Sequence, residues 1–264
     1  MTRFVALFVA LLAGVAVAVW FYRAPPGAAP APIVRNDDRW LDDLQSRSPK
    51  EVEQATAELE QRGTGALPVL RRTLQDEGSP ATRRKAALKG AAILGARAAE
   101  VVPDVVAMLQ QPEYAPEAAL ALSFMGSASV SSLRDAIHSD EPVVRREALR
   151  AMGKLRERAS IDPQIVIPAL LEALADPDPT VRNVAVTYLG IVRDDPKTEV
   201  AGLIKALADE NAEVRQAAAA ALAEYGALAE PAIPALKKAS NDPDEEVRRE
   251  AGRTLVHLAE LKNR

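Results

Sequence analysis

The chain has 264 residues, of which 48% are hydrophobic and only 4% aromatic, so it can bury a core of Ala, Leu and Val. It contains no cysteine, which excludes a disulfide scaffold, a thiolate zinc site, a cysteine nucleophile and a lipoprotein-type lipid anchor. Three of the 33 basic residues and no acidic residue precede Asn36, which leaves 30 basic against 37 acidic residues in the rest. A body with this balance is soluble and has no electrostatic bias towards DNA.

The first segment of the chain is apolar. Residues 4–22 form 19 consecutive residues without a charge, flanked by Arg3 and Arg23. A helix of this length nearly spans a hydrocarbon core of about 30 Å, and the aromatic residues 20–22 suit its headgroup end. The pattern predicts that residues 1–23 form one signal-anchor helix, single-pass in a bacterial inner membrane, with the body extracytoplasmic. The alternative is a signal peptide cleaved after Ala16-Val17-Ala18, which would leave a secreted or periplasmic protein.

Residues 24–36 are rich in proline and alanine, which blocks helix and favours extended backbone. They predict a semi-rigid linker that lifts the body off the bilayer. A disordered tail without a role fits the same composition.

A four-residue pattern, Val-Arg-x-x-Ala, recurs along the rest of the chain. Its arginines are 37, 33 and 33 residues apart, at Arg145, Arg182, Arg215 and Arg248. A fixed period of this length is typical of a stacked helical solenoid, in which neighbouring units bury a shared core and leave a long surface for partners.

The segment from Asp176 to Asp209 shows one unit most clearly. An acidic cap with proline begins a first helix, Asp194-Asp195-Pro196 breaks it, and apolar residues from Val200 rebuild a stripe in a second helix. Looser copies run upstream to Leu59, and Trp40 covers the open amino-terminal end. The sequence predicts an all-α domain over residues 37–264 with about six helix pairs and partial elements at both ends.

The repeated arginines need negative partners, because stacked units place them in one column where like charges repel. An aspartate lies six residues before each of three arginines. Guanidinium and carboxylate match in a two-point geometry. We predict a structural Arg–Asp ladder made of Asp176, Arg182, Asp209, Arg215, Asp242 and Arg248.

Two phrases, DPDPTVRNVAVTYLG at residues 176–190 and AIPALKKASNDPDEEVRREAGRTL at residues 232–255, resemble HEAT repeats. They are most similar to the short bacterial subtype also found in phycobilin lyase subunits. The resemblance covers about Trp40 to the carboxyl terminus and is strongest from Asp140 onward. It implies a right-handed α-α superhelix and a role in protein–protein scaffolding, and it supplies no catalytic motif.

The sequence contains no recognisable catalytic set. Its two histidines, His138 and His257, are about three units apart and cannot share a metal. There is no phosphate-binding glycine loop and no nucleophile elbow. We therefore expect no enzymatic activity, no cofactor, no metal and no small-molecule substrate.

Charged residues on the second helices are candidates for partner binding. Counting from the proline of each second helix selects one position that points away from the core on the expected concave side. These five positions form the second-helix stripe: Arg72, Asp135, Glu172, Lys205 and Lys238. A denser basic group, between Arg145 and Arg158, could meet an acidic partner or anionic headgroups, or be solvated.

Together these features predict a membrane-tethered scaffold that binds one or more proteins on the extracytoplasmic side. One alternative, from the resemblance, is an accessory subunit of a chromophore lyase. Another is a HEAT-like DNA glycosylase, which the acidic body and the scattered tyrosines disfavour.

Overall fold

The structure is a computed structural model that describes residues 8–12, 15–19, 38–158 and 161–262. The chain divides into two compact units, Met1–Asn36 and Asp37–Arg264. The linker predicted at residues 24–36 lies outside the described residues.

In the first unit, strands β1 (Phe8–Leu12) and β2 (Val15–Val19) pair antiparallel, with Phe8 opposite Val19. The expectation of one helix across residues 4–22 is therefore wrong for these ten residues. The expectation rested on length and apolarity, which do not separate helix from strand, whereas valine at alternate positions of 15–19 favours extended backbone. Among the described residues, no helix has both the length and the apolar character needed to cross a membrane.

The described part of the second unit is helical and contains no strand. Short α1 (Arg39–Asp43) precedes six helix pairs, which agrees with the predicted number, and α14 (Glu245–Lys262) follows them. The pairs are α2 (Pro49–Arg62) with α3 (Leu67–Gln75), α4 (Ala81–Leu94) with α5 (Val102–Ala107), α6 (Ala115–Phe124) with α7 (Val130–Ala136), α8 (Pro142–Glu157) with α9 (Pro163–Ala173), α10 (Pro179–Val192) with α11 (Pro196–Ala206), and α12 (Ala212–Ala223) with α13 (Ile233–Ala239).

The predicted acidic cap with proline is present at the start of α10. The Asp178 side chain accepts a hydrogen bond from the Thr180 backbone N–H, and proline occupies the first helical position. Asp195 and Asn211 also accept backbone N–H hydrogen bonds, at the starts of α11 and α12, although α12 has no proline at its first position. Each cap satisfies backbone donors that the first turn of a helix leaves unpaired.

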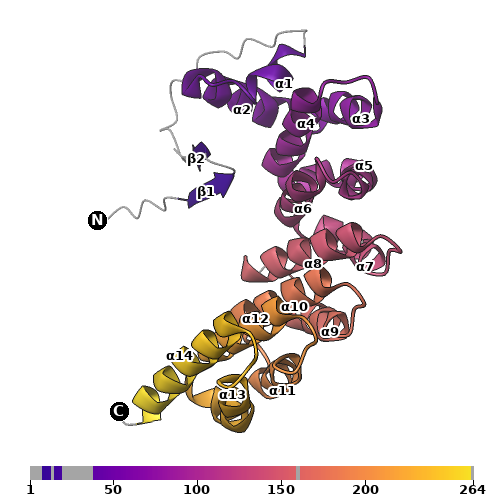
Figure 1. Ribbon diagram of the computed structural model, residues 1–264. Helices are drawn as coiled ribbons and strands as arrows, with labels where there is room; N and C mark the ends of the chain where they lie inside the picture. The colour runs from indigo at the N-terminus through magenta and orange to yellow at the C-terminus, as the bar shows by residue number, and fades with distance from the viewer. Residues whose placement is uncertain (1–7, 13–14, 20–37, 159–160, 263–264) are drawn as a thin grey trace, which may run out of the picture. The chain divides into compact units, whose positions relative to one another are not determined.

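The helices form two layers (Figure 1). The first helices α4, α6, α8, α10, α12 and α14 each contact the next, and the second helices α3, α5 and α7 do the same, as do α9 and α11. Small residues allow the close approach within the first layer. A Cβ on Gly190 of α10 would lie 2.9 Å from the Ala221 side chain of α12, and one on Gly153 of α8 would lie 2.2 Å from the Tyr188 ring of α10.

The core is continuous and mostly aliphatic. Leu59, Leu122, Leu189 and Leu222 are fully buried at intervals along the stack. Trp40 on α1 is 1% exposed, and α1 packs on α2 and α4. The partial element predicted at Trp40 therefore covers the amino-terminal end of the described stack.

Glycine occupies two corners between helices, at Gly95 and Gly226, eight residues before Pro103 and Pro234. Gly95 (φ 57°) directly follows α4, and Gly226 (φ 54°) lies three residues after the end of α12; each opens a 3-10 turn, Gly95–Val101 and Gly226–Ala232. The positive φ at both positions is strained for other residues. Arg193 after α10 also has a positive φ, but its backbone (φ 51°, ψ 39°) is left-handed helical, unlike that of Gly95 (φ 57°, ψ −132°).

The ladder between repeats and the second-helix surface

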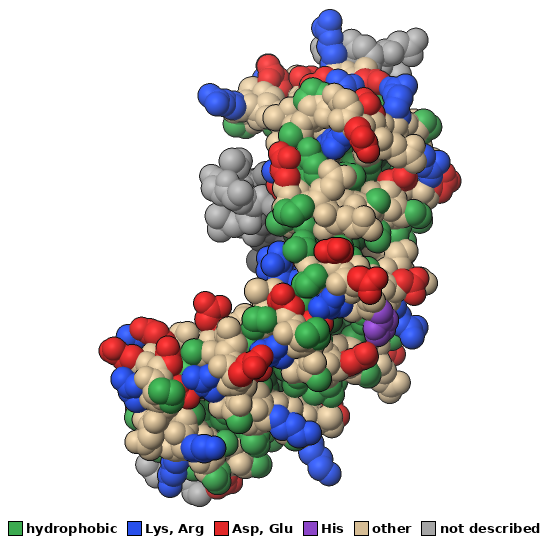
Figure 2. Space-filling model, turned by 45° about the vertical axis from the view of Figure 1, so that its right-hand side comes forward, with side chains coloured by type: hydrophobic (Ala, Val, Ile, Leu, Met, Phe, Trp, Pro, Cys, Tyr) green, Lys and Arg blue, Asp and Glu red, His purple; other side chains and the backbone are tan. Residues whose placement is uncertain are grey.

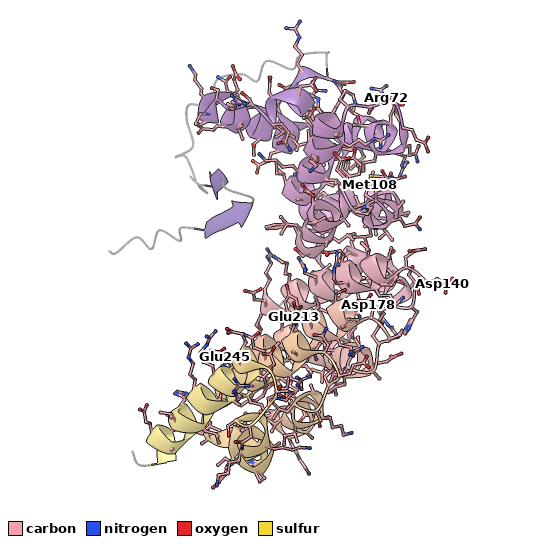
Figure 3. All side chains as sticks on the ribbon, in the orientation of Figure 1. Arg72, Met108, Asp140, Asp178, Glu213 and Glu245 are labelled. Atoms are coloured by element: carbon pink, nitrogen blue, oxygen red, sulfur yellow. The ribbon has the colours of Figure 1, made fainter. Side chains whose placement is uncertain are left out.

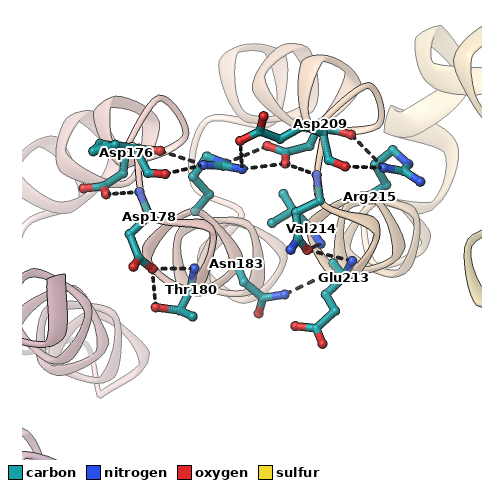
Figure 4. Close-up of polar contacts among 12 residues, drawn as sticks. Asp176, Asp178, Thr180, Asn183, Asp209, Glu213, Val214 and Arg215 are labelled. Atoms are coloured by element: carbon teal, nitrogen blue, oxygen red, sulfur yellow. Dashed lines mark hydrogen bonds and ion pairs between the residues drawn. The ribbon is translucent and has the colours of Figure 1, made fainter.

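From α8 onward, the Arg–Asp ladder joins each unit to the one that follows it (Figure 4). Arg182 Nε and Nη2 donate to the two carboxylate oxygens of Asp209, both at 2.8 Å. Arg182 Nη1 donates to the backbone carbonyls of Asp176 at 2.9 Å and Pro177 at 3.1 Å. One guanidinium therefore forms hydrogen bonds both with the turn before its own helix and with the turn before the first helix of the next unit.

The same geometry appears one unit earlier and one unit later. Arg145 pairs with both oxygens of Asp176 at 2.7 and 2.8 Å, and Arg215 pairs with those of Asp242 at 2.8 Å. The backbone carbonyl of each aspartate thus accepts a hydrogen bond from the arginine six residues later. Its carboxylate accepts hydrogen bonds from the arginine of the preceding unit. Arg248 makes the carbonyl contacts, to Asp242 and Pro243 at 2.8 Å, and is exposed.

The electrostatics of the ladder favour its ionised form. Burial alone would raise the pKa of the Asp209 carboxyl, but hydrogen bonds from the Arg182 guanidinium and the Asn211 backbone N–H outweigh it and hold that pKa below its ordinary value. The pKa of Asp176 is lowered in the same way, with burial opposed by Arg145. For Asp242 the hydrogen bond from Arg215 is the largest cause of a lowered pKa.

The ladder does not extend into the amino-terminal pairs. Arg84 occupies the equivalent position on α4 and donates from Nε and Nη2 to the carbonyl of Asp76 at 3.1 and 2.7 Å. Its guanidinium lies over the Tyr114 ring of the next unit, 5.7 Å from the centroid. The next unit has Ala115 where the other repeats have arginine, and Ser139 stands where an aspartate would pair with it.

The five residues of the second-helix stripe lie on five different second helices, and all are exposed. Figure 3 shows Arg72 on α3. Arg72 Nη2 lies 2.6 Å from an Asp38 oxygen, and a Glu172 oxygen lies 3.8 Å from His138 Nδ1. The structure gives Asp135, Lys205 and Lys238 no ion pair within its described residues. Side chains of both charges are interspersed with apolar ones over α3, α5 and α7 (Figure 2).

Two shallow hollows lie along the second helices. One, of about 460 Å³, is lined by five residues of α3 and the turn after it: Pro68, Arg71, Arg72, Gln75 and Asp76. The other, of about 230 Å³, lies between the end of α7 and α9, and Ile137, Ile165 and Pro168 contribute apolar surface beside His138 and Glu172. These hollows suit contact with side chains of a protein partner better than enclosure of a small molecule, which needs a deeper, mostly apolar cavity.

A buried polar group that the sequence did not single out lies between α10 and α12. Glu199 of α11 is 0% exposed, and the Tyr225 hydroxyl lies 3.0 Å from its Oε2 and 2.6 Å from the Leu189 carbonyl oxygen. Burial raises the pKa of Glu199 against the opposing hydrogen bond from Tyr225. A protonated Glu199 can donate to Tyr225 Oη while Tyr225 donates to the carbonyl, which satisfies all three groups. Only the fold brings residues 26 positions apart together here.

No group of three or more His, Asp or Glu side chains suited to a metal ion occurs within the ranges 38–158 and 161–262. His138 follows α7, and His257 lies on α14, on separate parts of the stack.

The comparisons agree with this architecture. The HEAT-repeat family model matches residues 130–200 and 167–256. Among solved structures, Kap121p has a TM-score of 0.64 at 16% identity, over 84% of this chain and 29% of Kap121p. Kap121p bound to RanGTP gives 0.65 at 16% identity, over 85% of this chain and 29% of the other. This chain therefore spans less than a third of the length of those relatives.

A chain of the CpcE–CpcF complex of phycocyanin lyase from Nostoc sp. PCC7120 has a TM-score of 0.50 at 22% identity, over 59% of this chain and 98% of that chain. No curated protein matches the sequence. The likenesses to solved structures concern the fold, and the family match begins at residue 130, just before the first arginine of the ladder. The body of this chain is a HEAT-repeat solenoid.

Proposed function

We propose that this chain is a non-catalytic scaffold that binds a partner protein along the second-helix stripe. The observation that carries the proposal is the stack of HEAT repeats, whose second helices present exposed charges and shallow hollows. The described residues assemble no metal cluster. Surfaces of this kind use charge complementarity to orient a partner and to speed its association.

The relatives of similar fold support a binding role. Structures record Kap121p bound to RanGTP and bound to Nup53p. CpcE and CpcF form a complex with each other. For the present chain, a protein partner is the proposal that follows from a shared fold.

Photocrosslinking in intact cells tests the proposal. p-Benzoylphenylalanine would replace Lys205 or Lys238 of the second-helix stripe in the full chain, and Glu213 on first helix α12 would be the exposed control. We expect discrete protein adducts at the two stripe positions and few at position 213. Equal labelling at all three positions, or none at any, would contradict the proposal.

The location of the scaffold is a second part of the proposal. The uncharged residues 4–22 support delivery of the body to the extracytoplasmic side of a bacterial-type membrane. An alkaline phosphatase fusion after Arg264 should be active if the body is exported. An inactive fusion, beside a cytoplasmic reporter that works at the same position, would place the body on the other side.

A role as accessory subunit of a chromophore lyase is the second candidate, because the likeness to CpcE–CpcF spans 98% of that chain. Co-expression with a bilin would then give a visible absorbance band that copurifies with the protein. An uncoloured protein would leave the scaffold proposal as it stands and exclude this alternative.

A further inference from the structure

Helix α14 is the last first helix of the described stack (Figure 1). One of its faces packs on α12, where Val247, Ala251 and Thr254 are buried and the Thr254 hydroxyl donates to the Ala219 carbonyl at 2.9 Å. A second row of residues, three or four positions apart, lies on a different side of the helix. We call this row the α14 end face, and its members are Arg248, Gly252, Leu255, Val256 and Ala259.

The positions that form this row on α14 are buried on the earlier first helix α10. Seven residues after its ladder arginine, α10 has Leu189, which is 0% exposed, whereas Leu255 of α14 is only partly buried. Eight residues after it, Gly190 is buried against α12, whereas Val256 is 59% exposed. A Cβ on Gly252 would meet no atom within 4 Å. An open face of a repeat stack is normally polar, so the apolar surface exposed on this one indicates a contact site.

The Arg248 guanidinium is already held in the orientation that the ladder uses. Its Nη1 donates to the carbonyls of Asp242 and Pro243, both at 2.8 Å, as Arg215 Nη1 does to the corresponding carbonyls at 2.8 and 3.0 Å. The Nε and Nη2 of Arg215 bind the Asp242 carboxylate. Those of Arg248 bind no carboxylate within the described residues, so two parallel donors point from a fixed guanidinium and match a carboxylate in bidentate geometry.

The ladder itself specifies what these two donors would bind. In each complete rung, the carboxylate comes from an aspartate three residues before the next first helix begins: Asp176, Asp209 and Asp242. We infer that the α14 end face docks a helix of a partner protein whose preceding turn carries an aspartate at this position. The inference rests on the proposed scaffold function, but it uses the first-helix layer and not the second-helix stripe.

Val256 adds a size requirement for the docking helix. The corresponding residue of α10 is Gly190, and a Cβ there would lie 2.9 Å from the Ala221 side chain of α12. Because valine is larger than glycine, the docking helix needs a residue no larger than alanine opposite Val256, and a slightly wider spacing than that between α10 and α12. Helix α12 itself has a suitable sequence, since Asp209 precedes it and Ala221 lies on its contact face.

Fluorescence anisotropy with the full chain tests this inference. The probe is a fluorescein-labelled peptide with blocked ends that copies residues 208–225, an alanine-rich sequence that favours helix. The same peptide with Asp209→Asn is its control. We expect the aspartate peptide to bind the unchanged chain, and the asparagine peptide to bind it at least about fivefold more weakly.

Three variants of the chain locate the binding site. Arg248→Gln should weaken binding of the aspartate peptide at least about fivefold and leave binding of the asparagine peptide nearly unchanged, because the two charged groups act as one pair. Val256→Gln should weaken binding of both peptides at least about threefold, since it removes apolar contact area. Arg253→Gln, on another side of α14, should change binding less than about twofold. All three replaced side chains are exposed, so each variant should melt close to the unchanged chain.

Equal binding of the two peptides, equal binding by the unchanged and Arg248→Gln chains, or no binding would overturn the inference. So would a dimer of the chain in sedimentation experiments that Arg248→Gln dissociates, because it would assign the α14 end face to a second copy. Crosslinks from positions 205 and 238 report on the second-helix stripe separately, so failure at α14 is distinguishable from failure of the proposed function.

Discussion

The carboxyl-terminal pairs, from α8 onward, are joined differently from the amino-terminal pairs. In the later pairs, two hydrogen bonds from an arginine to a half-buried aspartate link each unit to the next. In the earlier pairs, Arg84 donates to a backbone carbonyl and lies over an aromatic ring. Ala115 occupies the arginine position of the following unit and has no hydrogen-bonding side chain. Both regions nevertheless stack their helices over one continuous aliphatic core.

The comparison separates two contributions to a solenoid. Apolar burial is common to both regions and supplies the stacking, because it needs only side chains of suitable size. The ladder adds geometric specificity, because a bidentate Arg–Asp pair fixes the position of one unit relative to the next. The HEAT-repeat family match, over residues 130–200 and 167–256, covers the region that has the ladder.

The largest expected effect tests what the two regions share. Leu222 and Leu122 are both 0% exposed, one in each region. Substitution of either by alanine should cost about 2–5 kcal/mol, because each removes buried methyl groups and leaves a cavity. Urea unfolding would measure it, and a cost for Leu122→Ala well under that range would show that the earlier pairs are loosely packed.

The next effect tests what separates the regions. Arg182→Met should cost about 2–3 kcal/mol, since it keeps the apolar stem and leaves the Asp209 carboxylate half-buried without its guanidinium. Arg84→Met, which leaves the Asp76 carbonyl without this donor and removes the contact with the Tyr114 ring, should cost about 1 kcal/mol. Equal losses in denaturant titrations would show that the ladder contributes nothing beyond ordinary hydrogen bonds.

Acid should weaken the carboxyl-terminal region first. The pKa values of Asp176, Asp209 and Asp242 are lowered in the folded chain, so the stability they contribute is complete above the ordinary aspartate value and is lost as pH falls through the folded values. Hydrogen exchange at about pH 3 and about pH 7 should show greater acid-induced opening in α10 and α12 than in α4. Uniform opening along the stack would contradict this expectation.

Glu199 should have the opposite pH dependence. Its folded pKa is raised, so its contribution is complete below the ordinary glutamate value and is lost as pH rises through the folded value. Glu199→Gln keeps a donor for Tyr225 and carries no charge, so it should remove this loss and raise the melting temperature most at neutral pH. A variant that melts below the unchanged chain at every pH would show that Glu199 is ionised in the fold.

The smallest effect is expected on the second-helix stripe. Lys205 is exposed on α11, and Lys205→Ala should change the free energy of unfolding by no more than about 0.5 kcal/mol. A cost comparable to that of Leu222→Ala would show that the residues facing solvent on the second helices are assigned incorrectly.

The sequence predicted most of the body because each helix carries local signals. Caps such as Asp178, breaks such as Asp195-Pro196 and the period of the apolar residues determine where helices begin and which faces are buried. The same signals placed Arg72, Lys205 and the other residues of the second-helix stripe on the exposed side.

The interactions between units could not be predicted in the same way. The sequence pairs Asp209 with arginine by period alone, and only the stacked fold shows that its carboxylate binds Arg182 while its carbonyl binds Arg215. The contact of Glu199 with Tyr225 has no periodic signal. The prediction missed the strands at residues 8–12 and 15–19 because it rested on length and apolarity, which do not separate helix from strand.

A double-mutant cycle on Arg182 and Asp209 tests the account most directly. With Arg182→Met and Asp209→Asn, alone and combined, the pair should show a coupling energy of about 1–3 kcal/mol. The matched cycle with Arg84→Met and Tyr114→Leu should show about 0.5 kcal/mol or less. Additive losses at Arg182 and Asp209 would contradict the claim that the ladder couples one repeat to the next.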